Sequence, residues 1–368
     1  MLAERTWVGL DVHARSVVGC AIDDEAGEIR TQRVAPQTEA VVAWVLALPG
    51  PVAVTYEAGP TGFGLARALA AAGVRCEVVA PSKLERPAGD KVKTDRRDAE
   101  RLARLLRIGE LPAVRVPSEA EEAARDLVRA REDARGDLMR ARHRLSKLLL
   151  RQGLVWERSA WTGAHTDWLR RQRFDRRGVQ LAFDEALDAV FSVHARRDRL
   201  DAAITEMAET LPLAGTVGRL CCLRGVSTLT AVGLCVEVAD WQRFTGSTIG
   251  SYLGLVPSEF SSGQRRVQGG ITKTGNGHAR RLLVEAAWHH RRPLRPSRDR
   301  ARRADGQPAA VRARAEAGNQ RLHQRWCRLE QRKKRPTVSV VAVARELAGW
   351  CWSLAVLEDN QARGVMTG

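Results

Sequence analysis

The order of short apolar segments in the first 107 residues limits the fold of this chain more than any other feature. Residues 6–12, 17–23 and 28–35 have the β-branched and apolar content of strands, and the segment DDEAGE predicts a hairpin turn between the last two. Helical periodicity then alternates with further strands. The predicted helices are residues 38–48, 62–72 and 95–108, and the predicted strands between them are residues 51–57 and 74–80.

A three-strand meander followed by strand–helix crossovers is the pattern of the RNase H-like fold, an α/β architecture. In that arrangement the first and fourth strands are parallel neighbours at the centre of the sheet. The sequence therefore predicts an N-terminal α/β domain over residues 1–110, followed by a chain that is mostly helical.

Residues 117–212 predict two long helices that form an antiparallel coiled-coil arm. Apolar residues recur there at spacings of three, four and seven, and a stretch rich in Trp and Arg separates the two runs. The residues of the two runs are Leu127, Ala134, Leu138, Ala141, Leu145 and Leu148, and Leu187, Val190, Leu200, Ile204 and Met207. Nucleic-acid binding, a contact between protomers and a plain spacer all remain open as the role of this arm.

Residues 213–368 form a third, mostly helical part. The segment LRGVSTLTA at residues 223–231 is typical of a helix-hairpin-helix, whose amides and helix N-terminus hold a phosphate. An ordinary corner between two helices explains the segment equally well. Nine arginines lie within residues 280–303, and residues 338–357 predict a final apolar helix that belongs to the core.

The composition favours a polyanionic partner and excludes several classes of protein. The formal charge is +17, the pI is about 10.6, and only seven of the 60 cationic residues are lysines. An apolar content of 44% excludes a disordered chain, and the sequence shows neither an apolar span of membrane length nor a secretory signal. Seven cysteines without a CxxC pair argue against disulfide and structural zinc scaffolds. We expect a cytoplasmic protein that makes no contact with membranes.

Four carboxylates of the first part form a candidate metal centre. Asp11 ends the first predicted strand and Glu57 ends the fourth, so parallel pairing would bring them side by side. Asp95 and Asp98 are three residues apart on the last helix of this part and share one face. Clustered carboxylates repel one another unless cations neutralise them, and their hard oxygens suit Mg²⁺ or Mn²⁺. Taken singly, each residue is more typical of a turn or of a helix start than of a metal ligand, and it is their joint placement that favours a metal site.

The segment YLGLVPSEFSSGQRRVQGGITKTGN, residues 252–276, combines serines, glycines and cations. A serine in such a loop could act as a nucleophile toward phosphorus, with nearby cations stabilising the developing charge. Composition alone favours a loop that grips phosphate without a covalent step. The candidate nucleic-acid-binding residues in and after this segment are Arg265, Arg266, Lys273, Asn276, Arg280 and Arg281.

Two sets of motifs resemble one known family. VGLDVH, TYEAGPTG and KTDRRDA resemble the DEDD transposases of bacterial insertion sequences, in the insertion-sequence one-ten class. LRGVSTLTA, DWQRFTGSTIGSYLGLVPSEFSSGQ and GGITKTGNGHARRLL resemble the second conserved domain of that family. The two sets occur in the right order and spacing over nearly the whole chain.

The resemblance implies a RuvC-like first domain with Asp11, Glu57, Asp95 and Asp98 as metal-binding catalytic carboxylates. It also implies a C-terminal domain whose catalytic serine corresponds best to Ser262, with Ser261 as the rival. Members of the family are serine recombinases that a bridge RNA guides, through pairing with target and donor DNA. They work as dimers that meet as a tetramer, with a composite site, and we expect this chain to act at the nucleoid.

Two other functions explain part of the same pattern. A metal-dependent nuclease of the junction-resolving type would use the carboxylates and water, and would leave the serine loop as a phosphate clamp. An inactive nucleic-acid-binding derivative would need only the net charge and the arginine-rich C-terminal part.

Overall fold

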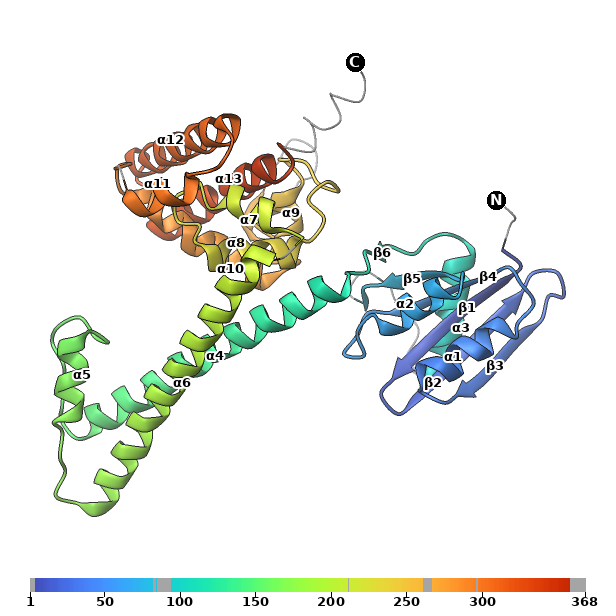
Figure 1. The fold of residues 1–368 in the computed structure, drawn as a ribbon, viewed down its shortest axis with the longest axis horizontal. Coiled ribbons are helices and arrows are strands. Elements are labelled where there is room, and N and C mark those ends of the chain that lie inside the picture. Colours follow the sequence, from blue (N-terminus) through green and yellow to red (C-terminus); the bar gives the residue numbers. More distant parts are fainter. Residues whose placement is uncertain are drawn as a thin grey trace. The chain divides into compact units, whose positions relative to one another are not determined.

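The computed structural model describes residues 4–81, 84, 94–210, 212–260, 267–295 and 297–357. The chain divides into two compact units, residues 1–118 and 119–368 (Figure 1). The first unit is a mixed α/β structure and the second is almost entirely helical, which confirms the predicted division of secondary structure. Each unit has its own hydrophobic core.

A six-stranded sheet forms the first unit, in the order β3-β2-β1-β4-β5-β6. The strands are β1 (Thr6–His13), β2 (Ser16–Asp23), β3 (Ile29–Val34), β4 (Val52–Glu57), β5 (Arg75–Val79) and β6 (Ala113–Val114). β1 pairs with β2 in antiparallel and with β4 in parallel orientation, so the predicted central pair is confirmed. The short β6, which no sequence pattern predicted, closes the edge beside β5.

Helices cover both faces of this sheet. Helices α1 (Thr38–Leu46) and α2 (Gly64–Ala71) pack on one face, over a core that includes Leu10, Val54, Tyr56 and Leu69. Helix α3 (Asp95–Arg107) packs against β1 and β2 on the other face, where Ala99 contacts Cys20. Alternate residues of each central strand therefore face different helices.

Helix α3 approaches β1 closely because Gly9 has no side chain. A Cβ atom on Gly9 would lie 2.0 Å from the carbonyl oxygen of Ala99 and 2.5 Å from the backbone nitrogen of Ala103. No real side chain fits that space, so the glycine sets the distance between the strand and the helix. This approach holds the start of α3 near the end of β1.

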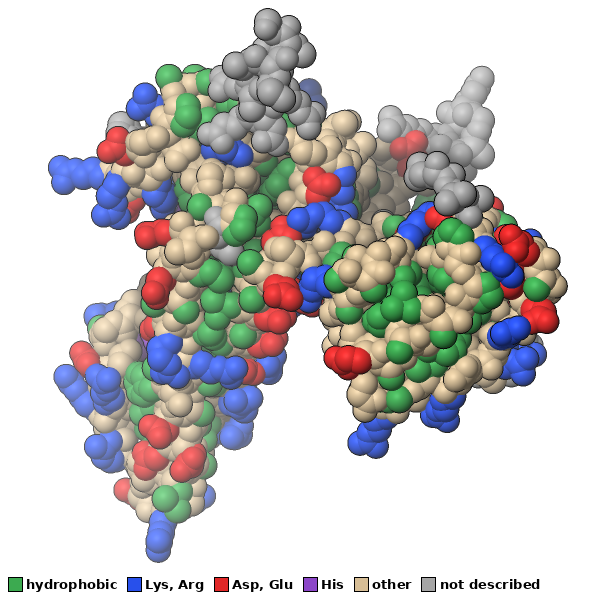
Figure 2. Space-filling view, turned by 45° about the vertical axis from the view of Figure 1, so that its right-hand side comes forward, with side chains coloured by type: hydrophobic (Ala, Val, Ile, Leu, Met, Phe, Trp, Pro, Cys, Tyr) green, Lys and Arg blue, Asp and Glu red, His purple; other side chains and the backbone are tan. Residues whose placement is uncertain are grey.

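The second unit begins with two long helices, α4 (Glu119–Arg151) and α6 (Arg177–Thr210), which pack along one another (Figure 1). Their shared core includes Leu145, Phe183 and Val190. The short helix α5 (Gly163–Arg170) lies in the connection between them, where Trp156, Trp161 and Trp168 surround the buried His165. Figure 2 shows Arg and Lys side chains on the surface of this pair of helices.

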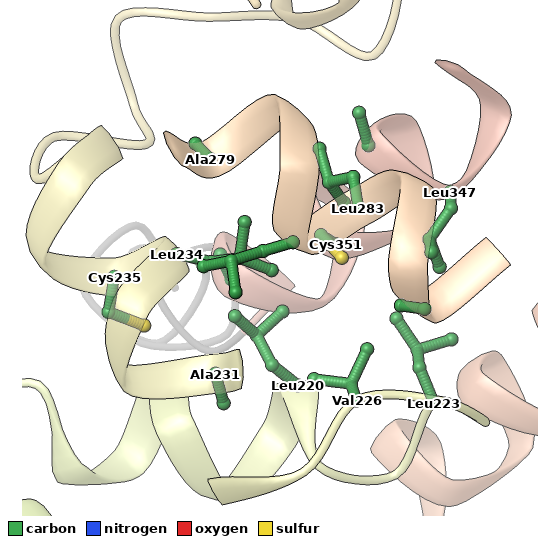
Figure 3. Packing of buried hydrophobic residues seen from close by; sticks show 14 of the residues in the cluster. Leu220, Leu223, Val226, Ala231, Leu234, Cys235, Ala279, Leu283, Leu347 and Cys351 are labelled. Atoms are coloured by element: carbon green, nitrogen blue, oxygen red, sulfur yellow. The ribbon is translucent and has the colours of Figure 1, made fainter. Parts of the chain in front are cut away.

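Shorter elements complete the second unit around a large apolar core. They are α7 (Ala214–Leu220), α8 (Thr228–Val238), α9 (Ile249–Tyr252), β7 (Pro257–Glu259), β8 (Gln268–Ile271), α10 (Gly277–Ala287), a 3-10 turn (Trp288–Arg291), α11 (Arg298–Ala304), α12 (Ala309–Gln331) and α13 (Pro336–Ala355). Figure 3 shows how side chains from α7, α8, α10 and α13 meet in this core, among them Leu220, Leu234, Leu283 and Leu347.

One helix among the described residues, α13, is long and apolar enough to cross a membrane by length and composition alone. Most of one side of this helix is buried, and Val343, Leu347 and Leu354 are each fully inaccessible to solvent, whereas Val338 in the first turn is exposed. The helix packs against α10 and α12, so its apolar character reflects its place in the core, as the sequence predicted for this last helix.

Candidate functional site

Strand alternation and register place Asp11 and Glu57 together on the face of the sheet that α3 covers. Leu10 and Tyr56 enter the opposite core, beneath α1 and α2, so the residues that follow them face α3. Leu10 and Tyr56 are also register partners in the parallel pairing of β1 with β4. Asp11 and Glu57 are therefore the next positions of two neighbouring strands.

The first turn of α3 supplies two more carboxylates. Thr94 caps this helix, because its side chain accepts a hydrogen bond from a backbone N–H of the first turn. Asp95 and Asp98 lie in that turn, where the positive end of the helix dipole favours negative charge. Because α3 crosses β1 at Gly9, its first turn lies near Asp11.

Asp11, Asp95 and His13 form a tight group of ligand atoms. One carboxylate oxygen each from Asp11 and Asp95 and one ring nitrogen of His13 lie within 4.8 Å of one another. His13 Nε2 is 3.2 Å from Asp11 Oδ1. The side chain of Asp11 is 18% exposed and that of His13 is 58% exposed, so the group is anchored in the sheet and open to solvent on one side.

The charges of this group act against one another. Burial raises the pKa of Asp11, and the negative charges of Asp95 and Asp98 raise it further, although His13 opposes them. Carboxylates that raise the pKa of a neighbour are the arrangement that a divalent cation relieves. Two carboxylates and an imidazole are also a donor set that divalent metals accept in proteins. The residues present therefore fit a metal centre.

Glu57 and Asp98 are not members of the tight group of described ligand atoms. Asp98 acts on Asp11 through its charge, and Glu57 stands beside Asp11 in the strand register. All four predicted carboxylates thus lie on one side of the sheet. Of the four, Asp11 and Asp95 have carboxylate oxygens within 4.8 Å of each other.

Sequence reasoning missed His13 as a member of this site. β1 continues to His13, two residues past Asp11, because the strand stays paired with β2 up to Ser16. The period of two in a strand is the signal that could have identified it, since residues 11 and 13 of one strand share a face.

A second predicted region surrounds the serine segment. Ser261, Ser262, Arg265 and Arg266 lie outside the described residues. The antiparallel strands β7 and β8 flank this segment, and Glu259 is a register partner of Gln268. The hairpin strands are therefore the described elements that carry the serine segment.

The loop after β8 is held tightly against the chain before β7. A Cβ atom on Gly275 would lie 1.9 Å from the carbonyl oxygen of Tyr252, and Gly275 has a φ of 68°, in the region that glycine favours. Arg280 donates hydrogen bonds of 2.9 Å to the carbonyl oxygens of Leu253 and Thr274. These contacts join the two ends of the hairpin region.

Glu237 of α8 holds the loop between β8 and α10 through contacts with Asn276 and His278. Its carboxylate accepts a hydrogen bond of 2.6 Å from Asn276 Nδ2 and lies 3.1 Å from His278 Nδ1. Asn276 also caps α10, because its side-chain oxygen accepts the Ala279 N–H. Burial alone would raise the pKa of Glu237, but the hydrogen bonds from His278 and Asn276 and the charge of Arg129 outweigh it and hold that pKa below its usual value.

Three of the predicted nucleic-acid-binding residues make contacts within the chain. Asn276 and Arg280 take part in the loop contacts above, and Arg281 forms ion pairs with Glu132 and Glu285. Lys273 is exposed and has a φ of 56°. Of the predicted cations in the described part of this region, Lys273 is the one whose ammonium group is open to a ligand.

Comparison with known proteins accounts for both regions. The family model described as "Transposase", of the DEDD type, matches residues 8–153, and the model described as "Transposase IS116/IS110/IS902 family" matches residues 218–302. The y4qE protein of Sinorhizobium fredii, named as a transposase, is 40% identical over 95% of this chain and 88% of its own length. The transposase for insertion sequence element IS1533 of Leptospira borgpetersenii is 34% identical over 91% of this chain and 99% of its own length.

These two relatives are similar to the chain from the sheet unit to the C-terminal helices, and the two family models match the segments that carry the carboxylates and the serine hairpin. The chain therefore belongs to the IS116/IS110/IS902 family of transposases, and it is a DNA-processing enzyme of an insertion sequence.

Proposed function

We propose that the sheet unit is an RNase H-like catalytic domain of the RuvC type, and that Asp11, Glu57, Asp95 and Asp98 hold Mg²⁺ or Mn²⁺. The observation that carries this proposal is the group of Asp11, Asp95 and His13, whose ligand atoms lie within 4.8 Å of one another on the α3 face. Glu57 supports it through the strand register, and Asp98 through its charge on Asp11. Oxygen-rich donor sets of this kind favour hard divalent cations.

Divalent cations at such a site supply activation of the attacking oxygen and stabilisation of the leaving oxygen in phosphoryl transfer. Asp11 and Asp95 would hold the cation through their carboxylate oxygens. His13, within hydrogen-bond distance of Asp11, orients that carboxylate and limits its rotation. Because Gly9 has no side chain, α3 packs close enough to β1 to place Asp95 beside Asp11.

The nucleophile in the proposed strand exchange is a serine of the serine segment, Ser262, with Ser261 as the rival. The serine Oγ attacks phosphorus of the DNA backbone, so that an Oγ–P bond forms and the bond from phosphorus to a sugar oxygen breaks. The hydroxyl proton passes to solvent, and the released sugar oxygen takes up a proton. Support comes from the anchored ends of the β7–β8 hairpin and from the exposed Lys273 beside it.

The partners follow from the family resemblance and the charge. The proposed substrates are the DNA of the element ends and of the target, with a bridge RNA as guide, and the net charge of +17 supports both polyanions. Arg265, Arg266 and Lys273 are the proposed contacts near the serine. The α4–α6 pair is the proposed arm domain, residues 117–212, between the catalytic domain and residues 213–368. The proposed assembly is a dimer that pairs into a tetramer, with the carboxylates and the serine of different protomers forming a composite site. The proposed location is the cytoplasm, at the nucleoid.

The test is excision of the element from a plasmid that carries this gene between its native flanking DNA. PCR and sequencing detect the circular junction for the wild type, Asp11→Ala, Ser262→Ala and Ser261→Ala. We expect the junction in the wild type and in Ser261→Ala, and its loss in the other two variants at equal protein levels. A junction that survives Asp11→Ala would overturn the metal-centre assignment.

A metal-dependent nuclease without a serine step remains the second candidate, because the carboxylate group stands on its own in the sheet unit. Strand cleavage that persists in Ser262→Ala and Ser261→Ala, but requires Asp11, would favour this candidate. A wild-type protein that binds DNA and produces no junction or cleavage would favour the inactive nucleic-acid-binding derivative.

A further inference from the structure

A cationic cavity of about 780 Å³ lies in the helical unit, and the assignments above do not use it. Residues of the turn between α7 and α8 line one side, and described residues from the end of α10 and from α11 line the other. Arginines dominate its lining. The lining includes five arginines and the serine that caps α8, namely Arg224, Arg292, Arg295, Arg300, Arg303 and Ser227.

The positive charge of this cavity, called here the arginine cavity, is not neutralised within the described part of the chain. Its one lining carboxylate, Glu285, is 2.6 Å from Arg281, which lies outside the lining. No salt bridge between described residues involves any of the five lining arginines. The Nε atom of Arg303 is buried and has no hydrogen-bond partner among these residues. Unpaired buried donors are costly, so an acceptor from a ligand would stabilise the site.

Arg224 is a fixed part of the wall. Its Nη1 donates to the carbonyl oxygens of Arg292 at 2.7 Å and Pro293 at 3.1 Å, and its backbone N–H donates to Asn319 Oδ1 at 2.8 Å. Burial lowers the pKa of Arg224, and the charges of Arg300 and Arg292 lower it further. The arginines therefore repel one another across a space that the fold holds open.

The turn between α7 and α8 is built to present helix α8 to this cavity. Gly225 has a φ of 84°, and a Cβ atom there would lie 2.4 Å from the carbonyl oxygen of Ala286 in α10. Ser227 caps α8 through its side chain, which accepts the Thr230 N–H, and both residues line the cavity. The N-terminus of an 11-residue helix adds positive potential to the arginine charges.

A second cavity of about 750 Å³ shares Arg295, Ser297 and Arg300 with the first. Arg298 and Arg312 add further cations to it, against one carboxylate, Glu316, and its remaining lining is largely apolar. The arginines of the two adjoining cavities extend over more space than a single phosphate group needs. A linear ligand with regularly spaced negative charges fits this arrangement better than a compact anion.

We propose that the arginine cavity binds the phosphodiester backbone of a nucleic-acid strand, at a site separate from the residues assigned to catalysis. This inference deepens the proposed function, since it gives the helical unit a contact that holds nucleic acid independently of the metal centre. Arginine forks match phosphate oxygens in two-point hydrogen bonds, so Arg292, Arg295 and Arg300 act as the gripping residues. The contacts reach the backbone and carry no sequence preference.

The experiment measures binding of the full-length protein to fluorescein-labelled duplexes of 20 base pairs, one of DNA and one of RNA, over a series of salt concentrations. The test variant is Arg292→Gln/Arg295→Gln/Arg300→Gln. The matched control removes the same charge from exposed positions in the last turns of α12 and in the link to α13, as Arg328→Gln/Arg332→Gln/Arg335→Gln. Circular dichroism melting checks folding of both variants, and Mn²⁺ titration checks the carboxylate centre.

We expect the test variant to bind at least one of the duplexes about tenfold or more weakly than the wild type, with Mn²⁺ binding unchanged. The slope of log K against log salt should fall by about 2 to 3, because each lost phosphate contact contributes about 0.9. The duplex with the larger change identifies the source of the backbone, DNA or RNA. Equal losses in the test and control variants, or an unchanged salt slope, would overturn the proposal.

Failure of the proposal is distinguishable from failure of the proposed function. If the arginine cavity has another ligand, an acidic peptide for instance, duplex binding stays at the wild-type level in the test variant while element excision still requires Asp11. If the chain is not an active recombinase, excision is absent while the test variant still loses duplex affinity.

Discussion

At the scale of single residues, the candidate metal site of the sheet unit centres on Asp11. This carboxylate is mostly buried, lies 3.2 Å from His13 and shares a ligand-sized space with Asp95. Its raised pKa reflects burial and two neighbouring negative charges. A proton and a divalent cation should compete for such a carboxylate, since either one relieves its repulsion with the neighbouring negative charges.

Asp11→Asn should weaken Mn²⁺ binding about tenfold or more, because it removes one anionic ligand from a small donor set. His13→Ala should weaken it less than Asp11→Asn, since His13 orients Asp11 and its loss removes no carboxylate ligand. Calorimetric titration of the metal-free protein measures both effects. Glu28→Gln is the control, because it removes an exposed carboxylate of the same unit that pairs with Arg30. A loss of equal size in the control would contradict the site.

Mn²⁺ affinity of the wild type should fall as the pH is lowered, and should begin to fall at a higher pH than an ordinary aspartate would allow. The reason is that the pKa of Asp11 lies above its usual value of 3.8, so protons compete with the metal earlier. The free energy of unfolding of the metal-free protein should change in the opposite direction. The contribution of Asp11 should rise as the pH falls, because a raised pKa in the folded state favours folding when Asp11 is protonated. Calorimetry at several pH values measures the first effect, and an affinity that is constant from pH 7 to pH 4 would contradict it.

Glu237→Ala should lower the free energy of unfolding by about 3 kcal/mol, because it leaves Asn276 and His278 without their buried partner. Urea denaturation measures this loss. The contribution of Glu237 should be present above pH 4.5, its ordinary value, and disappear as the pH falls through its lowered pKa. Asp299→Ala is the control, since its pair with Arg302 is exposed and should be worth less than about 0.5 kcal/mol.

At the scale of elements, the contact of β1 with α3 decides whether the carboxylates meet. Asp11 belongs to a strand and Asp95 to a helix that follows it by more than 80 residues, so their distance depends on how closely the two elements pack. The absent side chain of Gly9 permits that packing. The cap at Thr94 then sets where the helix begins, and so where its first acidic turn lies.

Gly9→Val should destabilise the sheet unit by about 3 kcal/mol or more, since its Cβ would overlap the backbone of Ala99 and Ala103. Mn²⁺ affinity should fall with it, because α3 must move away from β1. Gly64→Ala is a matched control in α2, where a Cβ meets nothing within 4 Å, and it should leave stability unchanged or raise it slightly. Denaturation that is identical for Gly9→Val and the wild type would refute the role of this approach.

At the scale of the whole molecule, buried cysteines lie in hydrophobic clusters of both units and can report on each unit separately. Cys20 is fully buried beneath α3 in the first unit, whereas Cys235 and Cys351 are fully buried in the core of the second. Burial raises the pKa of the thiol of Cys351 to about 12 and that of Cys235 as well, so neither reacts readily in the folded state.

Gly9→Val should lower the urea concentration at which Cys20 becomes reactive to a thiol reagent, and should leave that of Cys351 unchanged. The reason is that the substitution acts on one core and the two cores bury separate sets of side chains. Mass spectrometry of the labelled peptides measures both transitions. A parallel shift of Cys351 would show that the two units unfold together.

The element order of the sheet unit is predictable from the sequence, because strand and helix periods are local properties of the chain. From β1 to α3, the strands and helices lie within about two residues of their predicted bounds. The parallel pairing of β1 with β4 is also predictable, since a three-strand meander followed by strand–helix crossovers is the pattern of the RNase H-like fold, in which these strands are central neighbours. The same pattern predicts that Asp11 and Glu57 are neighbours.

Which side chains meet across long stretches of sequence depends on how the elements pack in three dimensions. This packing brought His13 into the carboxylate group, because pairing with β2 extends β1 beyond the apolar run. It engaged Asn276 with Glu237, although composition favoured phosphate binding for that loop. It also gathered Arg224 and Arg303 around one cavity. These approaches depend on how whole elements pack, and no local pattern of residues records that packing.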